Sequence, residues 1–163
     1  MDMAKLFGLP AHPLLVHVPI VLLPIVALAT LGMAVVPAWR ARIGWIVVAL
    51  AGVAVLGVQL ALGSGEALEK HVPRSKVLER HTELAGSLRP LALVLFLLVL
   101  ALVLLDRRPS ASLPSWVVPV VAVLAVVSGV ATTYRLAEVG HNGARASWGE
   151  TDMSSNHGRP SGG

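Results

Sequence analysis

The sequence contains no cysteine. This absence excludes disulfide bonds, zinc sites built from thiolates, iron–sulfur clusters held by cysteine and covalent haem attachment through a C-x-x-C-H motif. Any metal or cofactor that the chain binds must therefore be held by histidine, methionine, carboxylate or backbone atoms.

Charged residues are scarce as well. They make up 13% of the 163 residues, whereas roughly 25% is typical of soluble domains, whose surfaces face water. Hydrophobic residues make up 55%, and the mean hydropathy is +0.76. Because so few charges cannot cover a globule of this size, the apolar surface must face lipid. The composition predicts an integral membrane protein with a single domain.

Aromatic residues make up only 4% of the chain, and basic residues outnumber acidic ones by 13 to 9. Both facts bear on whether the protein binds nucleic acid. Nucleic-acid binding needs a dense basic patch with aromatic or groove-reading elements. Here the basic residues fall in gaps between apolar runs, which is typical of anchors that flank membrane spans. We expect the lipid bilayer as a partner and no nucleic acid.

Four apolar runs are long enough, with their flanks, to cross a bilayer as helices. About 20 helical residues span the roughly 30 Å hydrocarbon core. The expected spans are residues 14–36, 43–65, 82–105 and 116–138. They predict an all-α fold, an integral membrane four-helix bundle with up-down topology that occupies residues 1–139. Residues 140–163 are polar, and we expect them to form a disordered tail.

Small residues recur at four-residue spacing in two of these spans. The rows are Gly57, Ala61 and Gly65 in the second span, and Ala125, Gly129 and Thr133 in the fourth. Such rows let helix backbones approach closely in lipid, although glycine and alanine are common in membrane helices in any case. The sequence contains no strong internal repeat.

An even number of spans places both termini on one side of the membrane. The two short loops on the other side, 37–42 and 106–115, carry Arg40, Arg42, Arg107 and Arg108. The positive-inside rule counts lysine and arginine in short loops near the spans. The density of lysine and arginine in these two short loops favours a cytoplasmic position. The total number of basic residues is larger on the side of the termini and favours the opposite orientation. We expect the termini to lie outside.

The six histidines all fall on the side of the termini. They are His12, His17, His71, His81, His141 and His157. Neutral imidazole is a good ligand for haem iron, zinc or copper, and four-helix interiors often hold such groups. The topology, rather than spacing along the chain, gathers these side chains.

The most specific hypothesis is a b-type haem with His17 and His81 as its axial ligands. His17 lies inside the first span, where a polar side chain is costly unless it faces inward, and Arg89 follows His81 by two turns and can pair with a propionate. His12 and His141 are the other candidates for this site. From the residues alone, a competing interpretation is at least as strong: His17 and Arg89 form hydrogen bonds that stabilise the bundle, and interfacial histidines bond to headgroups and water.

Residues 12–20, His-Pro-Leu-Leu-Val-His-Val-Pro-Ile, resemble the His-Pro-x-x-Val-His-Phe-Pro-Ile signature of a bacterial membrane family, the domain of unknown function 2231. The resemblance extends to the four-span layout, to His81 before the third span, and to a Gly-His-x-Gly-Ala motif at 140–144. Val18 departs from the family's usual phenylalanine. Residues 145–148 depart from its apolar continuation.

The resemblance implies a multi-pass protein of the bacterial cytoplasmic membrane with unsettled activity. Some relatives are joined to Rieske-type iron–sulfur domains, which implies that a redox protein is a partner. Two functions follow as hypotheses: a haem-binding electron-transfer protein, and a cofactor-free accessory or structural subunit of a larger membrane complex. Self-association is open as well, and a histidine-based metal transporter is less expected. A hydrolytic enzyme is the least expected class, since no nucleophile–base–orienter set occurs.

Overall fold

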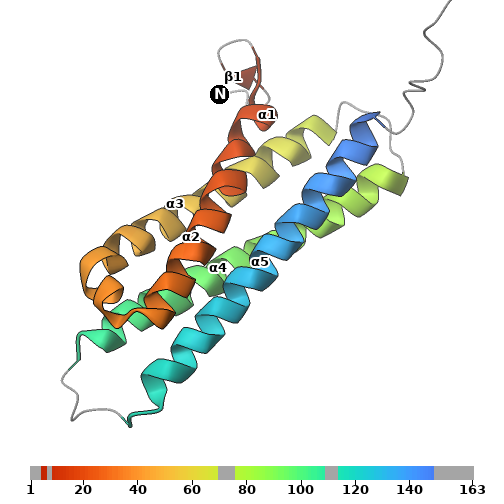
Figure 1. Cartoon of the computed structure of the whole chain (residues 1–163). Coiled ribbons are helices and arrows are strands. Elements are labelled where there is room, and N and C mark those ends of the chain that lie inside the picture. Colours follow the sequence, from red (N-terminus) through yellow and green to blue (C-terminus); the bar gives the residue numbers. More distant parts are fainter. Residues whose placement is uncertain (1–4, 7–8, 70–75, 109–113, 149–163) are drawn as a thin grey trace, which may run out of the picture.

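The computed structural model describes residues 5–6, 9–69, 76–108 and 114–148 of the chain, which form a bundle of four long helices (Figure 1). These are α2 (His17–Val35), α3 (Pro37–Glu69), α4 (Lys76–Asp106) and α5 (Val117–Trp148). The short helix α1 (Ala11–Leu15) precedes them, after the two-residue antiparallel strands β1 (Lys5–Leu6) and β2 (Leu9–Pro10). Each long helix is apolar and long enough to cross a membrane. The predicted all-α, four-span bundle is confirmed.

The side chains are distributed as a membrane demands. Large apolar residues such as Leu28, Leu56 and Val130 are 64–69% exposed, while Ala54 and Ala125 are fully buried. Lipid tails are as apolar as leucine, so burying leucine provides little driving force and close contact between small residues holds the helices together. The outward-facing apolar surface is therefore the lipid-facing surface.

The turn between α2 and α3 follows from proline chemistry. Val36 is extended, with φ −118° and ψ 94°, because a residue before proline is disfavoured in the helical region. Pro37 then starts α3, where its missing N–H costs nothing. Trp39 folds back over Gly32, at which a Cβ atom would lie 2.5 Å from the indole ring. The turn thus needs a glycine at position 32.

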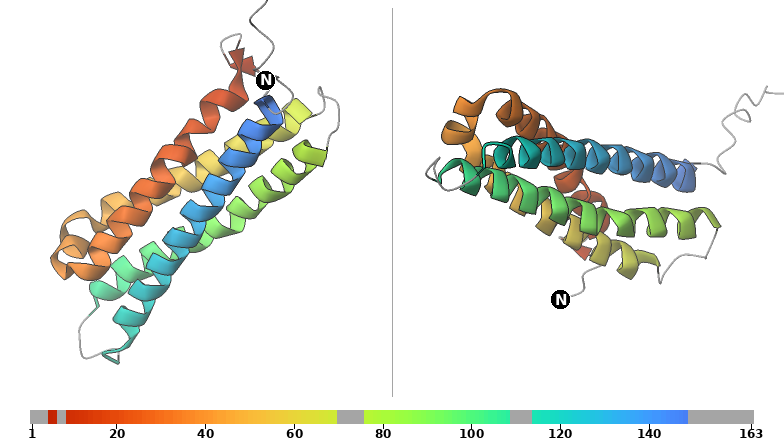
Figure 2. Two further views of the ribbon diagram at one scale, coloured as in Figure 1. Left: turned by 45° about the vertical axis from the view of Figure 1, so that its right-hand side comes forward. Right: turned by 90° about the horizontal axis from the view of Figure 1, so that it is seen from below.

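Each helix of the bundle packs against two others. Helices α2 and α4 both pack against α3 and α5, so α2 lies diagonally across from α4, and α3 from α5 (Figures 1 and 2). The chain therefore consists of two helical hairpins, α2–α3 and α4–α5, that pack side by side.

These two hairpins repeat one pattern of burial. In α2 the buried positions are Pro19, Leu23, Val26, Thr30 and Met33, and 69 positions later Leu88, Ala92, Leu95, Val99 and Leu102 are buried in α4. In α3 they include Gly44, Val47, Ala51 and Ala54, and 78 positions later Ala122, Ala125, Gly129 and Thr132 are buried in α5. The offset from α3 to α5 is nine residues larger than the offset from α2 to α4. The reason is that the connection between α4 and α5 is nine residues longer than the one between α2 and α3.

The two halves are thus structurally equivalent, although their sequences show no strong repeat. Each half crosses the membrane twice and starts on the same side. Parallel repeats of this kind are related by an axis along the membrane normal. Equivalent residues of α2 and α4 therefore lie at the same depth on opposite sides of that axis.

Three helices are longer than the sequence predicts, which corrects the expected boundaries. Helix α3 reaches Glu69 and α4 begins at Lys76. Helix α5 continues to Trp148, so residues 140–148 are helical, and the prediction of a disordered tail from residue 140 is wrong there. Residues 149–163 lie outside the described part. The helical continuation has a physical reason: in residues 136–148 the side chain of Asn142 bonds to the Glu138 carbonyl, and His81 of α4 packs on Gly143.

The small-residue row of α3 packs against the start of α2. A Cβ atom at Gly57 would lie 2.6 Å from Cγ1 of Val18 and 3.3 Å from Cδ of Pro19, whereas one at Gly86 would meet nothing within 4 Å. We expect Gly57→Ala to lower the free energy of unfolding by about 1–3 kcal/mol through overpacking. Gly86→Ala should be neutral or stabilising by up to about 1 kcal/mol, because alanine is the better helix former. Unfolding in mixed micelles measures both, and equal effects would contradict the close approach.

Candidate functional site: a symmetric pair of histidines

The terminus-side end of the bundle extends beyond the hydrocarbon core. Helix α4 has 31 residues and ends at Asp106, so a span of about 20 residues begins near Gly86. In α5, which starts at Val117, the corresponding limit is near Leu136. His81 therefore lies just outside the core. His12 lies at the same depth, since it precedes Pro19 by the same seven residues by which His81 precedes Leu88.

His12 is fixed by the end of α3. Its Nδ1 lies 3.1 Å from the carbonyl oxygen of Ala61 and 3.1 Å from Oγ of Ser64. The Ser64 hydroxyl itself donates to the Ala61 carbonyl, at 2.9 Å. Because a carbonyl can only accept, Nδ1 of His12 carries the hydrogen. In the neutral ring, Nε2 is then the nitrogen with the free electron pair.

A glycine makes room for this ring. A Cβ atom at Gly65 would lie 3.1 Å from Cε1 and 3.4 Å from Nδ1 of His12. Such a contact is tighter than an alanine side chain normally makes, so the imidazole lies directly against the backbone of α3. Gly65 is one helical turn beyond Ala61, and both contact the same ring.

His81 repeats this arrangement on α5. Its Nδ1 is buried without a hydrogen-bond partner among the described residues, and the backbone of Val139 lies near the ring. A Cβ atom at Gly143 would lie 3.0 Å from Cε1 and 3.3 Å from Nδ1 of His81. Gly143 follows Val139 by four residues, as Gly65 follows Ala61. One half of the protein thus copies the packing of a histidine ring on a glycine that is seen in the other.

His12 and His81 are 69 residues apart, which is the offset between the two halves, so their imidazoles occupy equivalent positions. They come from α1 and α4, elements of the two diagonal hairpins, and each ring packs against the second helix of its own hairpin. Two imidazoles at one depth, each packed on a glycine of the second helix of its own hairpin, form a pair of nitrogen donors at this end of the bundle.

The structure places the other predicted site residues differently. His17, Arg89 and His141 are exposed. His141 is two positions from both Val139 and Gly143, so it points away from the face of α5 that holds His81. His71 and His157 lie outside the described residues. Of the five predicted site residues, the structure places His12 and His81 in equivalent, partly buried positions.

Three residues of the site were not predicted from the sequence. Ser64 contacts Nδ1 of His12, and Gly65 and Gly143 leave room for the rings of His12 and His81. Gly65 was assigned to a small-residue row, and Gly143 to the family-like motif. The spacing of each histidine from its glycine differs between the halves, 53 residues for His12 and 62 for His81. A regular motif therefore could not reveal them.

The opposite end of the bundle is held by charge. Nε of Arg40 lies 2.9 Å from Oδ1 of Asp106, with the side chains only 10% and 25% exposed, although the N–H is not aligned for a full hydrogen bond. The guanidinium of Arg107 lies 5.5 Å from the ring centre of Trp45, a cation–π contact. Both interactions join the start of α3 to the end of α4, and therefore join the two hairpins.

Fold and site together define a class: a four-span membrane protein built from two equivalent hairpins, with a histidine pair at the mouth of the bundle. A family model described as "Predicted membrane protein (DUF2231)" matches residues 8–151. The chain belongs to this DUF2231 family. No curated protein and no solved structure matches the chain.

Proposed function

We propose that this protein binds a b-type haem through His12 and His81 and transfers electrons at the membrane surface. One observation carries the proposal: Nδ1 of His12 bonds to the Ala61 carbonyl of α3, and His81 takes the equivalent position on α5, with its buried Nδ1 3.3 Å from where a Cβ of Gly143 would lie. Histidines that ligate metals almost always donate their other ring N–H in this way, which fixes the ring and leaves Nε2 to coordinate. Bound haem supplies one-electron redox chemistry.

The donor set favours haem over a bare metal ion. Structural zinc takes four protein ligands and catalytic zinc takes three. In the described part of the chain, no three histidine, cysteine or acidic side chains gather closely enough to hold a metal. Haem iron needs only two axial ligands from the protein, and the histidine pair provides that number.

His12 replaces His17 in the pair predicted from the sequence. His17 is exposed, whereas His12 is partly buried, as His81 is. Arg89 is exposed about one turn inside the hydrocarbon boundary, where a long side chain can reach the headgroup layer. Its predicted pairing with a propionate is the weaker part of the hypothesis.

The position of the pair suits exchange with a partner in water. His12 and His81 lie at the membrane boundary, so a soluble redox protein can approach the site without crossing lipid. Within this proposal the membrane is the bacterial cytoplasmic membrane, and the termini and the histidine pair lie outside. The arginine-rich loops then face the cytoplasm, as the positive-inside rule favours.

The absorption spectrum of the purified full-length chain tests the proposal. Protein from haem-sufficient cells should show a Soret band and, after dithionite reduction, a sharp α band of a six-coordinate low-spin b haem. Pyridine haemochrome analysis should find about one haem per chain, since the bundle has one such pair. A colourless protein that also takes up no added haemin would overturn the proposal and favour a cofactor-free accessory subunit.

A further inference from the structure

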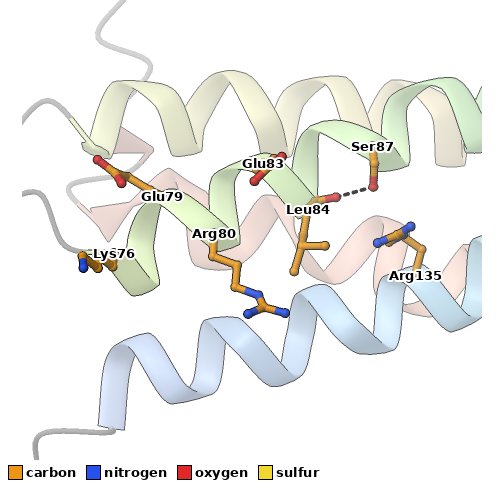
Figure 3. Close-up of a pocket in the computed structure, with 7 residues that line it drawn as sticks. All are labelled: Lys76, Glu79, Arg80, Glu83, Leu84, Ser87 and Arg135. Atoms are coloured by element: carbon orange, nitrogen blue, oxygen red, sulfur yellow. Dashed lines mark hydrogen bonds between the residues drawn. The ribbon is translucent and has the colours of Figure 1, made fainter.

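An open cleft of about 620 Å³ lies between the first turns of α4 and the middle of α5, apart from the histidine pair (Figure 3). Figure 3 shows Arg80 pointing from α4 toward α5, and Arg135 rising from α5 beside Ser87. The remaining lining comes from Lys76, Glu79, Glu83 and Leu84. The cleft is thus lined by side chains of both charges.

The depth of this cleft matches the lipid headgroup layer. Ser87 and Arg135 lie at the edge of the hydrocarbon core, which α4 enters near Gly86 and α5 leaves near Leu136. Headgroups occupy roughly 5–8 Å on each side of that core. At 1.5 Å per residue, Glu83 lies about 5 Å further out along α4, within this layer, and the backbone of Arg80 lies about 9 Å out, just beyond it. A phospholipid beside the protein places its headgroup at this level.

The charges in the cleft do not neutralise each other. Among the described residues, salt bridges join Arg40 to Asp106 and Arg135 to Glu138, so Arg80, Glu79 and Glu83 are left without one. The Arg135–Glu138 pair, at 3.2 Å, is 37% and 35% exposed. An exposed pair of this kind contributes little, so Arg135 can turn to another anion at little cost.

We propose that this cleft binds the headgroup of a zwitterionic phospholipid with a primary ammonium, phosphatidylethanolamine. The phosphate lies between Arg80 and Arg135, and the ammonium donates hydrogen bonds to Glu79 and Glu83. Arg135 is the deepest charge and Glu79 is among the outermost. Arg135 therefore lies at the level of the phosphate, which is nearer the acyl chains than the amine, and Glu79 lies further out, as the amine does. Arg80 starts further out than Glu83 and reaches the phosphate through its long side chain, which Figure 3 shows extending toward α5.

The mixed lining argues against the other common headgroups. Phosphatidylcholine has no N–H to donate to the two carboxylates. Phosphatidylglycerol brings no positive charge, so Glu79 and Glu83 would gain no partner from it. The proposal does not depend on haem, because none of the cleft residues belongs to the histidine pair.

Competitive lipid retention tests this proposal. Full-length protein is delipidated in mild detergent and incubated with equimolar phosphatidylethanolamine, phosphatidylcholine and phosphatidylglycerol of identical acyl chains, and retained lipid is counted by native mass spectrometry. We expect about tenfold preference for phosphatidylethanolamine, since charge-assisted hydrogen bonds are the strong ones. Arg135→Gln and Glu83→Gln should each reduce retention to the phosphatidylcholine level.

Two controls complete the experiment. Arg108→Gln, an exposed arginine at the opposite end of the bundle, should leave retention unchanged, and circular dichroism confirms that each variant is folded. Equal or better retention of phosphatidylglycerol, with no effect of Glu83→Gln, would overturn the proposal in favour of an anionic lipid. Displacement of the lipid by millimolar inorganic phosphate would overturn it in favour of a soluble anion.

Discussion

His12→Ala and His81→Ala are each expected to lower the haem content of the purified protein at least tenfold, whereas His17→Ala and His141→Ala should retain it. The reason is the loss of a coordinating nitrogen, which costs more than the roughly 10–100-fold in affinity that follows from losing an outer partner of a ligand. Pyridine haemochrome analysis and the α band of the reduced protein measure the effect in all four variants.

A merely structural role of the two histidines must be separated from ligation. His12 also bonds to the end of α3, so its replacement can loosen the bundle. Imidazole added during purification should restore the six-coordinate spectrum of His12→Ala and His81→Ala, because a small ligand can fill the space that the side chain leaves. Loss of haem in His17→Ala, with His12→Ala unaffected, would instead support the pair predicted from the sequence.

The second large effect is expected at the opposite end of the bundle. Asp106→Asn should lower the free energy of unfolding by about 3 kcal/mol, because it leaves the 10%-exposed Arg40 side chain without its counter-charge. The loss should appear as a shifted midpoint when the protein is unfolded with SDS in mixed micelles. Because Arg40 begins α3 and Asp106 ends α4, the variant should also weaken the contact between the hairpins.

The matched variants define the origin of this effect. Arg40→Met combined with Asp106→Leu should recover most of the stability, since replacing a buried pair by apolar residues is often neutral. Arg108→Gln, which removes an exposed charge from the same region, should change stability by less than about 0.5 kcal/mol. If Asp106→Asn were as mild as Arg108→Gln, the ion pair would not hold the hairpins together.

The sequence was sufficient for the number and kind of helices because lipid imposes a strong rule. Every backbone polar group in the hydrocarbon must be satisfied within the chain, so long apolar runs must be helical. The ends of the helices were predicted less well. Residues 140–148 are polar, and their composition does not show that the His81 ring packs on Gly143 and that α5 continues there.

The candidate site was predictable only in part. Even-numbered crossing gathers the histidines on one side, and this put His12 and His81 among the candidates. The sequence favoured His17, which lies inside the first expected span, over His12, which precedes it. That choice depends on which imidazole faces Ala61 and Ser64, residues about 50 positions away along the chain.

The sequence by itself determined that this is a membrane protein with four helices long and apolar enough to cross the bilayer, because hydropathy and chain length act locally. Only the tertiary structure decided that the two hairpins are equivalent and that His12 and His81 occupy matching glycine cradles. The physical reason is that burial and close backbone approach are properties of pairs of helices. Residues as different as Pro19 and Leu88, or Thr30 and Val99, take equivalent buried positions that no comparison along the chain reveals.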